Sequence, residues 1–392
     1  MYYNNLERKG DVMKLKTWHL FAVIIALFVC SFYVVNLKFD KFYRVNGINN
    51  DNRVLIEKYL DKEEQSYLID NQISIDLFID YIEYDDFHLQ NYQYYNALKD
   101  TKRYTNTQEI LEVGNSLADR LTYLYNSKAT NYAKNLIDNS LELAFLNEST
   151  FDFIYLNLYN DMQPLYAEGD YTYIKDTKEY VLRLKSLGVE RIEDLEETFY
   201  KLTAAYTKTS LKQLMTAPID SDVSIVYNPY ELSTLVDDHH YIGEYEPKGL
   251  LLTQDIPRVR YAMYLQNEAY NALLKMYQDL SKEYSGFLLK DAYVSSQNLE
   301  QNPIGFDERQ LGLTIDVTKS EIAYQEFENT DISKWLEQHA YEYGFILRYP
   351  KNKASITGNS YNPHIYRYVG EALAKTLYES NMTLEEYQSQ ES

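Results

Sequence analysis

Apolar residues follow three different patterns along this 392-residue chain. The first is a nearly unbroken apolar run over residues 17–35, and about 20 such residues are what a membrane-spanning helix requires. The second is helical spacing between residues 45 and 217, with one face formed by Ile110, Val113, Leu117, Leu121 and Leu124, and with Ser74 predicted to cap a further helix over 77–82. The third begins near residue 225, where strand-like runs alternate with helical stretches.

The third pattern predicts an α+β fold, a small mixed sheet with helices. Strands are expected at 287–289, 313–317 and 345–349, and helices around 268–284 and 332–343. Composition also changes before this region, because Pro164 is the only proline between residues 45 and 217, whereas seven follow from Pro218 onward. The predicted organisation is a cytoplasmic tail (1–16), a transmembrane helix (17–37), an extracellular helical segment (45–217) and a folded domain (225–387).

The apolar run is better explained as a retained anchor than as a cleaved signal peptide. A signal peptide has a shorter apolar core and a small-x-small cleavage site, and the sequence Phe-Tyr-Val-Val at 32–35 offers none. Basic residues flank the run on both sides, so the positive-inside rule only slightly favours a cytoplasmic N-terminus. Translation could start at Met1 or at Met13, where Lys-Leu-Lys follows directly.

Charge and cysteine content exclude several classes of function. The chain has 59 acidic and 38 basic residues, a net charge of −21, so it would repel phosphate backbones and no nucleic-acid partner is expected. Cys30 is the only cysteine, which rules out an intramolecular disulfide and a cysteine-based zinc cluster.

Three ordered blocks stand close together near the C-terminal end of the chain. They are Gly-Phe-Asp-Glu-Arg-Gln-Leu-Gly-Leu-Thr-Ile-Asp at 305–316, Tyr-Gly-Phe-Ile-Leu-Arg-Tyr-Pro at 343–350 and Tyr-Asn-Pro-His-Ile-Tyr-Arg-Tyr-Val-Gly at 361–370. These blocks resemble the VanY-like D-alanyl-D-alanine carboxypeptidases, which trim peptidoglycan stem peptides. The resemblance covers residues 225–387 and implies the fold of these zinc peptidases.

The same resemblance indicates that most of the zinc site is substituted. In the family, two His and one Asp hold zinc and a Glu acts as base. Arg309 and Ile365 stand at the two His positions and Asn362 at the Glu position, whereas Asp316 is retained. A catalytic zinc needs about three N, O or S ligands, and neither a guanidinium nor an aliphatic side chain offers a lone pair. No cofactor is therefore expected.

Substrate anchoring is also expected to be lost. Val294 stands where the family has an Arg that binds the substrate carboxylate. Metal roles for His239 and His240, and a salvaged site using Asp316 with His364, are less favoured than ordinary structural roles. Because the first two ligand positions approach one metal in the family, Arg309 and Asp316 are predicted to form a structural ion pair.

Three functional hypotheses follow from the sequence. One is a membrane-anchored, extracellular pseudo-peptidase that binds peptidoglycan stem peptides or an envelope protein. Another is an active D,D-carboxypeptidase with an altered site. The third is an envelope scaffold that acts through the helical segment.

Overall fold

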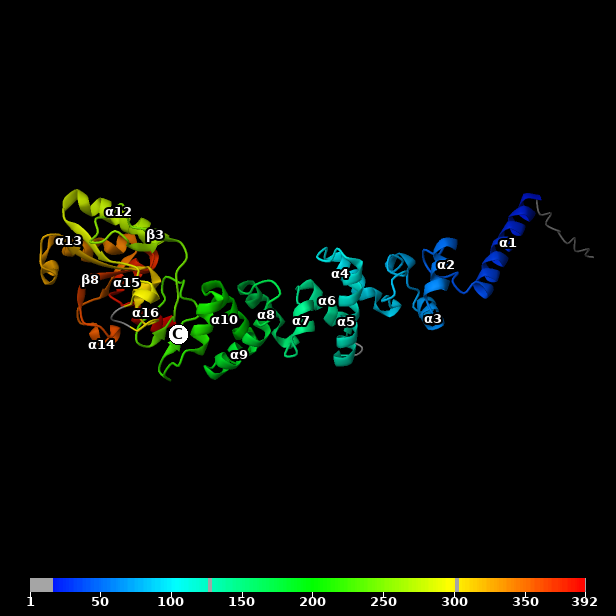
Figure 1. Cartoon of the computed structure of the whole chain (residues 1–392). Helices are drawn as coiled ribbons and strands as arrows, with labels where there is room; N and C mark the ends of the chain where they lie inside the picture. Colours follow the sequence, from blue (N-terminus) through cyan, green and yellow to red (C-terminus); the bar gives the residue numbers. More distant parts are fainter. Residues whose placement is uncertain (1–16, 126–128, 300–302, 392) are drawn as a thin grey trace, which may run out of the picture. The chain divides into compact units, whose positions relative to one another are not determined.

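The computed structural model describes residues 17–125, 129–299 and 303–391 (Figure 1). The chain divides into two compact units, Met1–Phe151 and Asp152–Ser392. The family-like region predicted over 225–387 lies within the second unit, together with helices that precede it in the sequence. The functional boundaries at 217 and 225 remain predictions.

The described part of the first unit is helical (Figure 1). Its long first helix contains the predicted membrane span, since Trp18–Asn36 is apolar enough to cross a membrane and none of it is buried. By length and composition the same helix could also serve as a signal sequence. The elements are α1 (Thr17–Phe39), α2 (Asn50–Tyr59), α3 (Lys62–Asp70), α4 (Tyr92–Asp100), α5 (Thr107–Tyr125), α6 (Ala129–Asp138) and α7 (Glu142–Asn147), with 3₁₀ turns η1 (Ile75–Leu77) and η2 (Leu89–Asn91).

Local sequence signals explain where these helices begin. Asp61 caps α3 by accepting the N–H groups of Glu63 and Glu64, and a capping carboxylate satisfies donors that the first helical turn leaves free. The helical face predicted in α5 is confirmed: Leu117 and Leu121 are buried, although Leu124 at its end is 48% exposed. A helix capped by Ser74 does not form. Only the turn η1 follows, and the Ser74 hydroxyl bonds the Asp76 carboxylate instead.

The second unit combines helices with three small sheets, so the α+β prediction is confirmed. Helices and turns of this unit are α8 (Leu156–Met162), α9 (Tyr173–Ser186), α10 (Ile192–Ala205), α11 (Lys208–Thr216), α12 (Asn267–Glu283), α13 (Asp331–His339), α14 (Ala354–Thr357), α15 (Glu371–Ser380), α16 (Leu384–Glu391), η4 (Phe153–Tyr155), η5 (Gln163–Leu165), η6 (Ser296–Asn298), η7 (Glu308–Leu311), η8 (Tyr324–Asn329) and η9 (Ala340–Tyr343).

The largest sheet has four strands in the order β5-β6-β8-β7, all antiparallel to their neighbours. The predicted strands correspond to β5, β6 and β7, and the predicted helices to α12 and to α13 with η9. A parallel pair β1-β2 and an antiparallel pair β3-β4 form separate sheets. The strands are β1 (Ser224–Ile225), β2 (His240–Tyr241), β3 (Leu250–Leu252), β4 (Tyr264–Gln266), β5 (Phe287–Asp291), β6 (Thr314–Lys319), β7 (Phe345–Tyr349) and β8 (Asn362–Tyr368).

Apolar side chains from β7 and the last two helices form part of the core. The cluster contains Ile346 of β7, Ala374 and Leu377 of α15, and Leu384 of α16. Gly312 has a positive φ of +66° and ends η7 immediately before β6. Glycine adopts this left-handed backbone conformation with less strain than other residues. The resulting turn places η7 at the end of the central strands.

Candidate functional site

The main sheet brings two of the predicted site positions side by side. Asp316 of β6 pairs in register with Ile365 of β8, and on its other side with Asp291 of β5, next to a bulge at residues 289–291. Residues directly opposite each other in an antiparallel sheet project to the same face. Asp291, Asp316 and Ile365 therefore form a row across three strands.

Arg309 contacts Asp291 of this row rather than Asp316, the partner predicted from the sequence. Its guanidinium binds both oxygens of Asp307, with Nη2–Oδ2 at 2.6 Å and Nε–Oδ1 at 3.0 Å, and its Nη1 lies 2.6 Å from Oδ2 of Asp291. The predicted ion pair with Asp316 does not form. Asp307 lies only two residues away at the start of the same turn, where it also accepts the N–H of Arg309. This nearer carboxylate therefore accepts two hydrogen bonds from the guanidinium.

The two carboxylates hold Arg309 firmly in its charged form. The hydrogen bonds that Arg309 donates to Asp307 raise the pKa of Arg309 above its already high value, and Asp291 adds to the effect. On its second oxygen Asp291 also pairs with Arg260. The Arg309 guanidinium is therefore fixed by two anions and has no lone pair for a metal.

Asp316 has its own partners. Lys290 Nζ lies 3.4 Å from Oδ2, and the Tyr324 hydroxyl donates to the carboxylate, with both oxygens at 3.1 Å. Lys290 also stands 3.4 Å from the centre of the Tyr324 ring, a cation–π contact. Burial raises the pKa of Asp316 although Lys290 and Tyr324 oppose the shift. The carboxylate oxygens of Asp316 are therefore already bound by the Lys290 ammonium and the Tyr324 hydroxyl.

The remaining positions carry no site chemistry of their own. Asn362 accepts the N–H of His364 at 3.0 Å, and Val294 donates its N–H to the Arg309 carbonyl at 3.4 Å. The His364 ring is buried and stacks on Tyr324 at 3.5 Å, while its Nδ1 donates to the Val317 carbonyl at 2.7 Å. This contact fits the structural role favoured for His364, and burial lowers its pKa.

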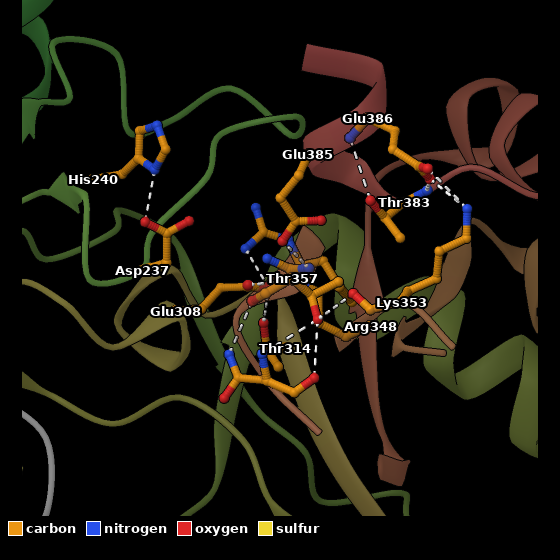
Figure 2. Close-up of polar contacts among 12 residues, drawn as sticks. Asp237, His240, Glu308, Thr314, Arg348, Lys353, Thr357, Thr383, Glu385 and Glu386 are labelled. Carbon is orange, nitrogen blue, oxygen red and sulfur yellow. Dashed lines mark hydrogen bonds and ion pairs between the residues drawn. The ribbon is translucent and has the colours of Figure 1, made fainter. Parts of the chain in front are cut away.

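Neither of the two adjacent histidines lies in this row. His240 Nδ1 is 2.7 Å from Oδ1 of Asp237 (Figure 2), and this hydrogen bond raises the pKa of His240. His239 is exposed, with Nδ1 3.7 Å from an oxygen of Asp222. In the chain as described, no group of three or more His, Cys, Asp or Glu side chains is arranged to hold a metal ion.

These residues do not fit the zinc ion of the family. Arg309, Asp291, Asp307, Asp316 and Lys290, which we term the substituted site, satisfy one another as ion pairs. Of Arg309, Asp316 and Ile365, the residues that the sequence resemblance predicts at the ligand positions, only Asp316 has an oxygen donor, and a catalytic zinc site needs about three protein ligands. No catalytic step through a metal can be derived from this arrangement.

Sequence reasoning missed a second set of charges beside the substituted site. Glu308 of η7 is buried and accepts from Arg348 Nε at 2.6 Å, from Arg367 Nη1 at 3.0 Å and from the Thr314 hydroxyl at 3.0 Å. Arg348 also pairs with Glu385 of α16 at 2.7 Å (Figure 2). We term Glu308, Arg348, Arg367 and Glu385 the buried cluster. Its signal was present in the sequence, as charged residues within otherwise apolar strand motifs.

Burial alone would raise the pKa of Glu308, but the two guanidiniums outweigh it and hold the pKa below its ordinary value. Arg367 is fully buried and also donates Nη2 to the carbonyls of Leu232 and Thr234. Charges without water are tolerated only when paired and hydrogen-bonded. The cluster therefore links η7 to the strands β7 and β8 and to helix α16. It holds in place the turn that carries Arg309.

Known proteins match the same region. The family model VanY, D-alanyl-D-alanine carboxypeptidase, matches residues 290–371. The putative carboxypeptidase YodJ of Bacillus subtilis (strain 168) is 31% identical over 194 residues, which cover 41% of this chain and 68% of YodJ. A D-alanyl-D-alanine carboxypeptidase of Enterococcus faecium is 42% identical over 85 residues, covering 22% of this chain and 27% of that protein.

Solved structures cover the same part of the chain. The LdcB LD-carboxypeptidase has 28% sequence identity and a TM-score of 0.41, covering 44% of this chain and 92% of that one. VanYB in complex with D-alanine-D-alanine has 22% identity and a TM-score of 0.34, covering 41% and 99%. The sequence match to two thirds of YodJ, together with the family model over the strands that carry the substituted site, assigns the chain: it belongs to the VanY family of D-alanyl-D-alanine carboxypeptidases.

Proposed function

We propose that this chain is a non-catalytic, carboxypeptidase-like protein of the bacterial cell envelope that binds peptidoglycan stem peptides or an envelope protein. The observation that carries the proposal is the guanidinium of Arg309, held by Asp291 and Asp307 at a metal-ligand position. Amide hydrolysis in such enzymes uses a metal to lower the pKa of water and a carboxylate to take its proton. Here the ligand set is incomplete and Asn362 cannot act as that base.

The ligand class is carried over from the relatives. The enterococcal relative is named for D-alanyl-D-alanine, and a scaffold of the same family that has lost hydrolysis can still offer the groove in which such a peptide lies. Binding without turnover is the function that a kept fold and a substituted site support best.

Catalysis is tested on the full chain purified in detergent. We expect substoichiometric zinc by mass spectrometry and no release of D-alanine from a peptide ending in D-Ala-D-Ala. The enterococcal carboxypeptidase serves as the positive control under the same conditions. Release of D-alanine that requires zinc and stops with a chelator would overturn the proposal and favour an active enzyme with an altered site.

We further propose that α1 anchors the chain in the cell membrane with the second unit outside. The support is the exposed, apolar helix Trp18–Asn36 and the external location of peptidoglycan. Protease added to intact, wall-stripped cells should degrade the C-terminal unit, while a cytoplasmic marker protein stays intact. Protection of the C-terminal unit in unbroken cells, or recovery of a chain cleaved after residue 35, would contradict this topology.

A further inference from the structure

A short segment contacts the outer edge of β5 through one isolated bridge. Arg258 forms a parallel bridge with Leu289 of β5. The Val259 N–H donates to the Leu289 carbonyl at 3.0 Å, and the Leu289 N–H donates to the Pro257 carbonyl at 2.8 Å. The segment 257–259 therefore lies along the outer side of β5, at this edge of the sheet.

The outer edge of this segment is free. Within the described residues, neither the N–H nor the C=O of Arg258 has a hydrogen-bond partner, whereas its neighbours bond inward to β5. Arg258 thus presents one unpaired N–H and one unpaired C=O, groups with which another extended chain can pair. Peptide recognition by strand addition uses such an edge, with main-chain bonds for affinity and side chains for specificity.

A hollow of about 550 Å³ lies along the same segment. Val259 and Tyr261 line it and are 52% and 77% exposed, which is high for apolar and aromatic side chains with no partner chain present. An aromatic ring at the rim of a hollow supplies contact area for a ligand at a small cost in side-chain entropy.

The hollow is positively charged on a strongly acidic protein. Arg258 uses its guanidinium to bind the carbonyls of Thr253, Ile256 and Tyr261, and no Asp or Glu among the described residues forms an ion pair with it. Arg260 has one partner, Asp291, and its side chain is 55% exposed. Against these two cations stands Asp255, while the whole chain carries −21. An anionic group is therefore the complementary ligand.

We propose that segment 257–261 is the docking edge for an extended peptide with a free carboxylate, which adds as an outer strand and places that carboxylate beside Arg260. The inference rests on the proposed peptide-binding function and locates it. Arg260 connects this edge to the substituted site, because Asp291 binds Arg260 with one oxygen and Arg309 with the other. The edge and the substituted site thus belong to one continuous surface.

The test uses the full chain in detergent and a fluorescein-labelled pentapeptide ending in D-Ala-D-Ala, followed by fluorescence anisotropy. Arg260→Gln and Tyr261→Ala should each weaken binding about tenfold or more, since a charge-assisted hydrogen bond or an aromatic contact is lost. Amidation of the peptide's C-terminus should weaken binding to the unaltered chain by a similar factor and to Arg260→Gln much less. Arg191→Gln is the matched control, because Arg191 is also an exposed arginine with a single carboxylate partner.

Hydrogen–deuterium exchange supplies a readout that a general loss of folding cannot imitate. Peptide should protect the Arg258 amide, which is free, and leave the already bonded Val259 amide unchanged. Equal affinity in Arg260→Gln, Tyr261→Ala and Arg191→Gln, or no binding of the pentapeptide by the folded chain, would overturn the inference. A concentration-dependent dimer that Tyr261→Ala dissolves, and that the peptide does not displace, would assign the edge to a second copy and also overturn it.

The two proposals fail separately. Zinc-dependent release of D-alanine refutes the non-catalytic function whatever the binding variants show. A zinc-free, inactive chain that binds the pentapeptide equally well in every variant refutes only the docking edge.

Discussion

Two adjacent residues on one turn belong to groups of opposite character. Arg309 points to the substituted site, where its side chain is 31% exposed and its partner Asp291 is 19% exposed, although its other partner, Asp307, is buried. Glu308 points to the buried cluster, where Arg367 is fully buried and Arg348 nearly so. The family model covers residues 290–371, which include the whole substituted site and all of the buried cluster except Glu385.

The difference teaches how such a domain can change its chemistry and keep its fold. Side chains in the buried cluster bridge four separate elements, so one loss leaves an unpaired charge without water. Of the ion pairs in the substituted site, those of Arg309 with Asp291 and of Lys290 with Asp316 involve partly exposed side chains, so the loss of either should cost less than a loss in the buried cluster. The following predictions test that contrast, in order of decreasing effect.

Removing the central anion should break the buried cluster. Glu308→Gln leaves the buried Arg367 without its carboxylate and Arg348 with Glu385 alone, and breaking a buried pair costs about 3–5 kcal/mol. The measurement is the free energy of unfolding in urea, followed by a probe in the C-terminal unit. Glu328→Gln is the control: it breaks the half-exposed pair with Lys351, for which we expect a change below about 1 kcal/mol. Similar losses in both variants would remove the distinction drawn here.

The partners of Arg309 can be measured by double-mutant cycles. Arg309→Met combined with Asp307→Asn should show a coupling energy of about 1–3 kcal/mol, because the two side chains form a two-point ion pair. Arg309→Met combined with Asp316→Asn should be additive within about 0.5 kcal/mol, because these residues share no partner. A larger coupling to Asp316 than to Asp307 would restore the ion pair expected from the sequence.

Restoring a zinc site should require more than the three family side chains. In the variant Arg309→His, Asn362→Glu, Ile365→His, the Lys290 ammonium still stands 3.4 Å from Asp316 and repels a metal cation. Adding Lys290→Ala should raise zinc affinity about tenfold or more, measured by competition with a chromogenic chelator. Lys351→Ala in the same background removes a lysine elsewhere and should change nothing. Equal affinity with and without Lys290 would show that the ammonium does not guard the carboxylate.

The two acidic groups should respond to pH with opposite signs. The folded-state pKa of Glu308 is lowered, so its contribution to stability is present above the unfolded pKa and is lost as pH falls through the folded value. The folded-state pKa of Asp316 is raised, so its contribution is present below the unfolded pKa and is lost as pH rises through the folded value. Between about pH 3 and 7, the loss of unfolding free energy caused by Glu308→Gln should grow as pH rises. Over the same range, the unfolding free energy of Asp316→Asn should rise relative to that of the unaltered chain. Parallel pH profiles for the two variants would contradict this.

Secondary structure was largely predictable because it follows from local patterns. Strands β5, β6 and β7 and helix α12 appear where apolar spacing placed them. The predicted helix at Ser74 failed because its hydroxyl found a side-chain acceptor in Asp76 rather than the backbone. The sheet register that places Asp316 opposite Ile365 depends on pairing between strands that are far apart in sequence.

The site was predictable in residue type but not in partnership. The sequence indicates that Arg309 and Ile365 cannot ligate zinc, and this depends only on their chemistry. The carboxylate that pairs with Arg309 depends on distances within one turn and across a strand, and in the structure Arg309 pairs with Asp307 in the same turn. Glu308 was overlooked because its partners lie 40 and 59 residues further along the chain, a separation that spacing rules cannot connect.

The long reach of the buried cluster has a consequence for how the domain matures. Arg348 needs Glu385 of α16, Lys353 needs Glu386, and Gln388 reaches back to the Ser233 carbonyl. Arg348 and Lys353 therefore acquire these carboxylate partners only after α16 has left the ribosome and, in the proposed topology, crossed the membrane. A nascent chain stopped before α16 would have two buried guanidiniums, Arg348 and Arg367, sharing the single carboxylate of Glu308, so the docking of α16 completes the charge pairing of the exported domain.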